Sequence, residues 1–161
     1  ADHESRVGVP EVAVRPFEPE GPDADAWIRV NNRAFADHPD QGTETAETLA
    51  DRLALPSVDP AGFLVADDPE RPGELGGFCW TVVHPRTASD PAIGEIYVIG
   101  VDPDRQGERW GPALVLAGLD HLAATGITQA MLYVDQANGA ARGLYKKLGF
   151  KSNHRRRVYQ R

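Results

Sequence analysis

The sequence has 161 residues, of which 41% are hydrophobic and 25% are charged, and its formal net charge is −7. These values are typical of one globular domain with a core of its own, and the negative charge argues against general binding to nucleic acid. We find no run of about 18 apolar residues and no basic, apolar leader, so we expect a cytoplasmic protein that does not span a membrane.

The first half of the chain mixes short strands and helices. Residues 1–10 are polar and irregular, and we expect a flexible leader there, before a domain of residues 11–161. Apolar spacing and turn residues then predict, in order, a strand (12–17), a helix (22–35), a second helix that Thr43 caps and that ends at Leu53, and an antiparallel pair of strands (62–66 and 75–84).

The second half has the pattern of parallel strand crossings. Residues 95–101 are apolar and β-branched, which indicates a buried central strand that ends at Asp102-Pro103-Asp104. The elements expected after it are a helix (111–124), a strand (128–135), a helix (136–148) and a final strand (150–159) that carries Arg155, Arg156 and Arg157 on alternating faces. The order β-α-α-β-β-β-α-β-α-β predicts a single α/β domain with a mixed sheet and helices on both faces.

Few side chains suggest metal or nucleophilic chemistry. The five histidines are scattered, with no pair at i, i+4, so we expect no metal site. The single cysteine, Cys79, lies between Phe78 and Trp80 and has no internal disulfide partner. This indicates a packed thiol in a strand and a reducing compartment, rather than a nucleophile.

The strongest candidate for ligand binding is the loop after the central strand. Residues 106–111 form a short glycine-bearing turn between a strand and the start of a helix. Free backbone N–H groups and the positive end of the helix dipole favour an anion at such a place, so we expect a pyrophosphate. The Walker and dinucleotide patterns are both absent, and the alternative is a purely structural turn.

Two motifs in this half of the chain resemble those of the GCN5-related N-acetyltransferase (GNAT) family. Gln106-x-x-Arg109-x-Gly111 is similar to the acyl-CoA motif of the family, and Asn138-x-x-Ala141-x-x-Leu144-Tyr145-x-x-Leu148-Gly149-Phe150 is similar to its second signature. Other stretches, among them 29–42 and 94–103, resemble an actinobacterial branch with two such folds in tandem. That branch acetylates the cysteinyl amine of a mycothiol precursor.

The resemblance implies an N-acetyltransferase that moves an acetyl group from acetyl-CoA to a primary amine of a small molecule by direct attack, without a metal. It makes Glu95 the base that takes the proton of the amine, directly or through water, and Tyr145 the proton donor to the departing thiolate. The alternative for Glu95 is a solvated charge or a partner of Arg86, and for Tyr145 a packed aromatic ring.

The resemblance also implies two sets of binding residues. Those expected to contact acetyl-CoA are Val98, Ile99, Gly100, Val101, Gln106, Gly107, Glu108, Arg109, Trp110, Gly111, Pro112, Asn138 and Arg142. Those expected to line the acceptor cleft are Asn31, His38, Trp80, Tyr97 and Tyr133, and the loop 36–42 is expected to order over the acceptor.

The loop departs from the family motif. Arg109 stands where the family has a glycine that can adopt positive φ and lets the backbone approach the pyrophosphate, and Glu108 adds a negative charge. An inward Arg109 side chain would block the site, whereas an outward one could pair with a phosphate. Two alternatives therefore stay open. One is a non-catalytic GNAT-fold domain, or half of a tandem enzyme, with a degenerate CoA loop, and the other is an acetyltransferase for a different amine. The candidate protein partners are a second GNAT fold or a second copy of this chain.

Overall fold

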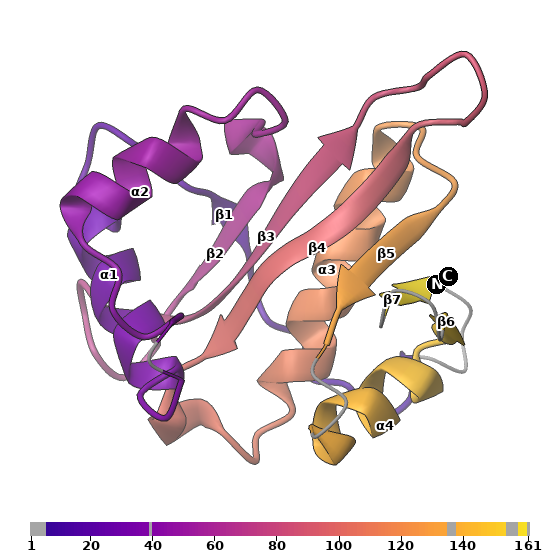
Figure 1. The fold of residues 1–161 in the computed structure, drawn as a ribbon. Helices are drawn as coiled ribbons and strands as arrows, with labels where there is room; N and C mark the ends of the chain where they lie inside the picture. The colour runs from indigo at the N-terminus through magenta and orange to yellow at the C-terminus, as the bar shows by residue number, and fades with distance from the viewer. Residues whose placement is uncertain (1–5, 39, 135–137, 154–157, 161) are drawn as a thin grey trace.

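The structure, a computed structural model, describes residues 6–38, 40–134, 138–153 and 158–160. Seven strands form one sheet in the order β1-β2-β3-β4-β5-β7-β6 (Figure 1). They are β1 (Arg15–Pro16), β2 (Phe63–Asp67), β3 (Leu75–His84), β4 (Ile93–Val101), β5 (Ala130–Tyr133), β6 (Lys151–Asn153) and β7 (Val158–Gln160). Only β4 and β5 pair in parallel among these neighbours of the described sheet, so the predicted mixed sheet is confirmed.

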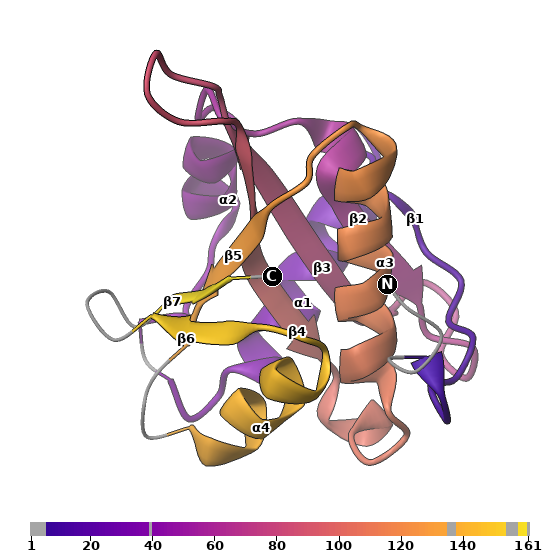
Figure 2. The same cartoon turned by 90° about the vertical axis from the view of Figure 1, so that its right-hand side faces the viewer.

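Helices cover both faces of this sheet, as predicted. They are α1 (Asp23–Ala34), α2 (Ala46–Leu53), α3 (Trp110–Ala124) and α4 (Gly139–Lys147), with short 3-10 turns η2 (Pro60–Gly62) and η3 (Pro103–Arg105). α1 and α2 lie on one face, and α3 lies on the opposite face with α4 beside its first turns (Figures 1 and 2). None of the helices in the described ranges has the length and apolar run that a membrane crossing needs.

The predicted order of elements is confirmed up to the last predicted strand, in whose place the structure has two short strands, β6 and β7. β6 and β7 pair antiparallel through Asn153 and Val158, so the chain reverses where one long strand was expected. The predicted alternation of Arg155, Arg156 and Arg157 lies outside the described residues.

The second helix is capped by Thr45 and not, as predicted, by Thr43. The Thr45 hydroxyl accepts from the backbone N–H of Thr48, and the Thr48 hydroxyl accepts from the backbone N–H of Thr45. This reciprocal pair satisfies two helix-end donors at once, which fixes the start of the helix at Ala46.

Two apolar cores lie against the two faces of the sheet. One packs β3, β4 and β5 against α3 and α4, and the other packs β2 and β3 against α1 and α2. Cys79 is fully buried in the first core, and this burial raises the pKa of its thiol to about 12. The thiol therefore stays protonated, and the prediction of a packed cysteine is confirmed.

The central strand separates from its parallel neighbour halfway along its length. β4 pairs with β5 only over Gly94–Ile96, although its pairing with β3 continues to Val101. A bulge in the β3–β4 ladder, between Trp80 and Thr81, leaves Tyr97 as the extra residue. Beyond Ile96 the two strands diverge, and the described part of β5 offers the far end of β4 no backbone partner.

The described part of the expected leader lies against α3. Two hydrogen bonds of 2.6 and 2.8 Å join the guanidinium of Arg6 to the carboxylate of Asp120, and Val9 packs against the adjacent core. Residues 6–10 are therefore held to the domain by charge and by apolar contact.

Candidate functional site

Two cavities open where β4 and β5 diverge. The first, which we call the loop cavity, has a volume of about 550 Å³ and lies between the end of β4, the loop before α3, and α4. The second, the strand cavity, has a volume of about 420 Å³ and lies between β4, β5 and the loop after α1. Both are lined by Phe35, Ile99, Asn138, Ala141 and Tyr145, so they meet at these side chains.

The loop cavity collects most of the residues that the sequence assigns to acetyl-CoA. Those that line it are Ile99, Gly100, Val101, Gln106, Gly107, Arg109, Trp110, Gly111, Pro112 and Asn138. Val98 lines the strand cavity, and Glu108 and Arg142 line neither of the two cavities in the described structure. The sequence missed Arg105, Ala140 and Leu144, whose place in the lining depends on how α4 and η3 pack.

Arg109 adopts the backbone conformation that a glycine would supply. Its φ is 64° and its ψ is 29°, which is the left-handed region that ordinary side chains disfavour by roughly 1–2 kcal/mol. Its side chain is exposed and reaches the leader, because a Cβ built on Gly8 would lie 2.6 Å from a guanidinium nitrogen of Arg109. The outward orientation leaves the cavity open.

The charge of Glu108 is balanced within the protein. Both carboxylate oxygens of Glu108 lie 3.3 Å from Nη1 of Arg105, whose Nη2 donates to Glu70 at 2.6 Å. Arg105 is almost fully buried and lines the loop cavity. The negative charge that the sequence places beside the expected anion is therefore offset by a neighbouring cation.

A buried carboxylate anchors the chain between β4 and the loop. The carboxylate of Asp102 forms ion pairs with Arg33 of α1 at 2.6 Å and with Arg71 of the β2–β3 turn at 2.8 Å. It also accepts a hydrogen bond from the backbone N–H of Asp104 at 3.0 Å. Burial works to raise the pKa of Asp102, but the Asp104 N–H and the two guanidinium groups outweigh it and hold the pKa below its usual value. The carboxylate thus stays charged and ties three segments together.

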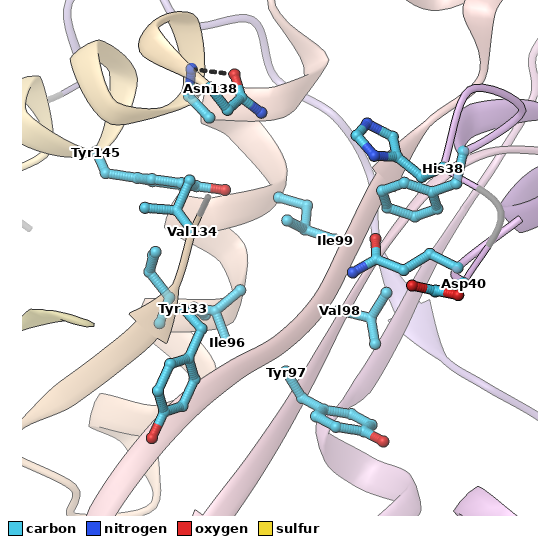
Figure 3. A pocket seen from close by; sticks show the side chains of 14 residues that line it. His38, Asp40, Ile96, Tyr97, Val98, Ile99, Tyr133, Val134, Asn138 and Tyr145 are labelled. Atoms are coloured by element: carbon cyan, nitrogen blue, oxygen red, sulfur yellow. Dashed lines mark hydrogen bonds between the residues drawn. The ribbon is translucent and has the colours of Figure 1, made fainter. Parts of the chain in front are cut away.

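Tyr145 lies where the two cavities meet. Its ring extends from α4, and its hydroxyl points toward β4 (Figure 3). Burial, followed by the nearby Cys79, raises the pKa of its phenol to about 12. The phenol therefore keeps its proton at neutral pH and can donate a hydrogen bond.

Asn138 begins the helix that carries Tyr145. Its side-chain oxygen accepts from the backbone N–H of Ala141 at 3.1 Å, which makes it the N-cap of α4 (Figure 3). Since Asn138 also lines both cavities, the same residue fixes the helix start and faces the site.

Three of the predicted acceptor residues line the strand cavity. His38 lies on the α1 side of the cavity, opposite Tyr145, while Tyr97 and Tyr133 extend from β4 and β5 (Figure 3). The hydroxyl of Tyr97 accepts from Nη1 of Arg52 at 2.6 Å, so α2 fixes its position. The loop that carries His38 also contributes Asp40 and Gln41, which sequence reasoning did not single out although it predicted the loop.

Asn31 and Trp80, the other predicted acceptor residues, line neither cavity. Trp80 is fully buried and stacks on Phe63, with 4.0 Å between the ring centroids. The Asn31 side chain is also buried, and it donates to the backbone carbonyl of Gln41 at 2.6 Å. Asn31 thus holds the loop that lines the cavity.

Glu95 lies beside the strand cavity but is not among its lining residues. Alternation along β4 directs its side chain to the same face as that of Tyr97, about 7 Å farther along the strand. The carboxylate is 11% exposed, and its Oε1 lies 2.7 Å from Nε2 of His84. Glu95 is therefore neither a solvated charge nor paired with Arg86, the two alternatives that the sequence left open.

The described residues contain no group of three or more His, Cys, Asp or Glu side chains arranged to hold a metal ion.

Comparison with known proteins places this site in context. The profile of the family described as "Acetyltransferase (GNAT) family" matches residues 25–150. The chain is 48% identical over 149 residues to mycothiol acetyltransferase from Kocuria rhizophila and 54% identical over 140 residues to that from Thermobispora bispora. These matches cover 92% and 86% of this chain but 49% and 46% of the relatives, so the chain spans about half their length.

The fold is similar to that of a solved GNAT-family acetyltransferase from Brucella melitensis in complex with acetyl-CoA. The TM-score is 0.69 at 22% sequence identity, and the match covers 94% of this chain and 87% of the other.

Proposed function

The chain belongs to the GNAT acetyltransferase family, and on that premise we propose that it transfers an acetyl group from acetyl-CoA to a primary amine of a small molecule. The observation that carries this proposal is the pair of cavities that meet at Tyr145 between the diverging strands. One cavity leads to the N-terminus of α3 and the other to the loop after α1, which gives each of two substrates an entrance of its own.

Acetyl-CoA is assigned to the loop cavity. Backbone N–H groups at the start of α3 and the positive end of its dipole would hold the pyrophosphate. The pantetheine arm would lie along the free edge of β4 from Val98 to Val101, and a backbone N–H there would polarise the acetyl carbonyl. The chain's own residues then carry the proton transfers.

The proposed reaction needs one base and one acid. Glu95 takes a proton from the ammonium group through water, and the freed amine lone pair attacks the acetyl carbonyl carbon. As the carbon–sulfur bond breaks, the Tyr145 phenol donates to the thiolate and regains a proton from the nitrogen of the new amide. The sum is an amide, a thiol and one proton released to water.

The acceptor is assigned to the strand cavity. The Asp40 carboxylate would attract an ammonium group, and His38, Tyr97 and Tyr133 offer polar atoms to hydroxyl groups. The names of the relatives favour the cysteinyl amine of a mycothiol precursor, so this is the acceptor that we propose. An acetyltransferase for another amine would use the same cavity.

Calorimetry tests the first half of the proposal. We expect acetyl-CoA to bind the chain at one site with micromolar affinity. Ala141→Phe should abolish this binding because Ala141 lines both cavities, whereas Ala123→Phe, on the exposed side of α3, should not. If millimolar acetyl-CoA gives no heat of binding while circular dichroism confirms that the chain is folded, the result would favour a non-catalytic domain.

Mass spectrometry of the product tests the second half. A cysteinyl acceptor carries a thiol of its own, so thiol reagents that measure released CoA would give false signals. We expect a product 42 mass units heavier, about the mass that an acetyl group adds when it replaces a proton on nitrogen. If the chain acetylates other amines but not the mycothiol precursor, the proposed reaction stands and the proposed acceptor is wrong.

A further inference from the structure

His84 holds the carboxylate that we assign as the base. In the β3–β4 ladder Val82 faces Glu95 and His84 faces Ile93, so His84 and Glu95 are diagonal neighbours on one face of the sheet. Nε2 of His84 lies 2.7 Å from Oε1 of Glu95. Within the described parts of the chain, His84 is the only side chain that bonds this carboxylate.

The contact allows two arrangements of the hydrogen, and the proposed base selects one of them. A carboxylate has only lone pairs to offer, so a bond of this length to an ionised Glu95 needs a hydrogen on Nε2 of His84. The opposite arrangement, a protonated Glu95 that donates to a bare Nε2, would leave no base. His84 is 43% exposed, which leaves Nδ1 of its ring for water, whereas Glu95 is largely buried.

We propose that His84 is a positioning residue for Glu95: its Nε2–H fixes Oε1, which leaves Oε2 as the oxygen that accepts the proton of the acceptor ammonium. This inference rests on the proposed acetyl transfer with Glu95 as base. The ammonium gives one proton through water to Oε2, and Oε2 later releases it to solvent. His84 keeps its own hydrogen throughout.

A pair of substitutions separates the N–H donor from the imidazole ring. His84→Leu removes the donor, and we expect kcat to fall ten- to hundredfold while the KM for acetyl-CoA stays within twofold. His84→Gln keeps an N–H of similar reach, and we expect it to restore kcat to within about fivefold of the unmodified chain. Calorimetry with acetyl-CoA confirms that each variant is folded and binds.

A double-mutant cycle tests whether His84 acts through Glu95. Glu95→Gln should itself lower kcat, and adding His84→Leu to it should lower kcat no further, since the group that His84 serves is gone. A merely structural role would instead give effects that add. An unchanged kcat in His84→Leu, or a His84→Gln variant as poor as His84→Leu, would overturn the proposal.

Nitrogen-15 spectroscopy of labelled histidine separates this proposal from the proposed function. We expect the resonances that disappear in His84→Leu to show a hydrogen on Nε2. A ring with hydrogen only on Nδ1 would overturn the inference even in an active enzyme. The Nε2–H form in a chain that binds acetyl-CoA but acetylates no amine would overturn the catalytic assignment and leave the contact intact.

Discussion

At the scale of single residues, Tyr145 permits the sharpest test of the proposed acid. Burial raises its pKa to about 12, so the phenol is protonated throughout the neutral range. We expect Tyr145→Phe to lower kcat about a hundredfold, within the usual range for a general acid, and to change the dissociation constant of acetyl-CoA by less than about threefold.

The matched control for Tyr145→Phe is Tyr133→Phe. Tyr133 lines the strand cavity but lies on β5, 57% exposed, and away from the loop cavity. Loss of the Tyr133 hydroxyl should raise the KM of the acceptor and leave kcat nearly unchanged. Equal effects of the two variants on kcat would argue against Tyr145 as the donor to sulfur.

Arg109 provides a second test at this scale, in the stability of the fold. We expect Arg109→Gly to stabilise the domain by up to about 1 kcal/mol, because relief of the left-handed strain outweighs the greater freedom of glycine in the unfolded chain. Arg109→Ala keeps the strain and should give no gain. Urea unfolding measures both, and equal gains would place the effect in the side chain instead.

At the scale of an element, Asp102 joins β4 to α1 and to the β2–β3 turn. Replacing it with alanine removes the buried partner of Arg33 and one of the two buried partners of Arg71, which keeps Asp68. We therefore expect a loss of about 1.5–3 kcal/mol in the free energy of unfolding. Asp104→Ala is the matched control: its carboxylate is 67% exposed, and the expected loss is under about 1 kcal/mol. Similar losses would contradict the assignment of Asp102 as the anchor.

The loop after α1 depends on Asn31 in the same way. Asn31→Ala removes the donor to the carbonyl of Gln41, so we expect the KM of the acceptor to rise about tenfold with the affinity for acetyl-CoA unchanged. Asp37→Ala, an exposed change in the same loop, should have no effect. A matching loss of acetyl-CoA affinity in Asn31→Ala would show that the loop supports both cavities.

The sequence predicts these elements better than the contacts between them. The order of strands and helices follows from local patterns, and the two motifs fall at the ends of β4 and β5 as their spacing requires. The pairing of Glu95 with His84 could not be predicted, because it depends on the register of β3 and β4. The contact between the outward Arg109 side chain and Gly8, about a hundred residues away in the chain, could not be predicted either.

At the scale of the whole molecule, the buried thiol and the buried phenol predict a fold that weakens in alkali. Burial raises the pKa of Cys79 from 9.0 and that of Tyr145 from 10.0, each to about 12. At pH 7 both groups keep their protons in the folded and the unfolded chain, so neither makes stability depend on pH there. Above pH 9 the unfolded chain loses the Cys79 proton first, and stability falls as pH rises.

By pH 11 the expected loss is roughly 4 kcal/mol, about 3 from Cys79 and 1 from Tyr145, at 1.36 kcal/mol for each pKa unit. Urea unfolding between pH 8 and 11 measures this loss, and the thiol contributes most of it in the interval from pH 9 to 10. Cys79→Ala should be less stable at pH 8, because the substitution leaves a small cavity. Its free energy of unfolding should change much less between pH 9 and 10 than that of the unmodified chain. An equal slope in both proteins would mean that other groups cause the loss, and that the thiol does not hold its proton in the folded core.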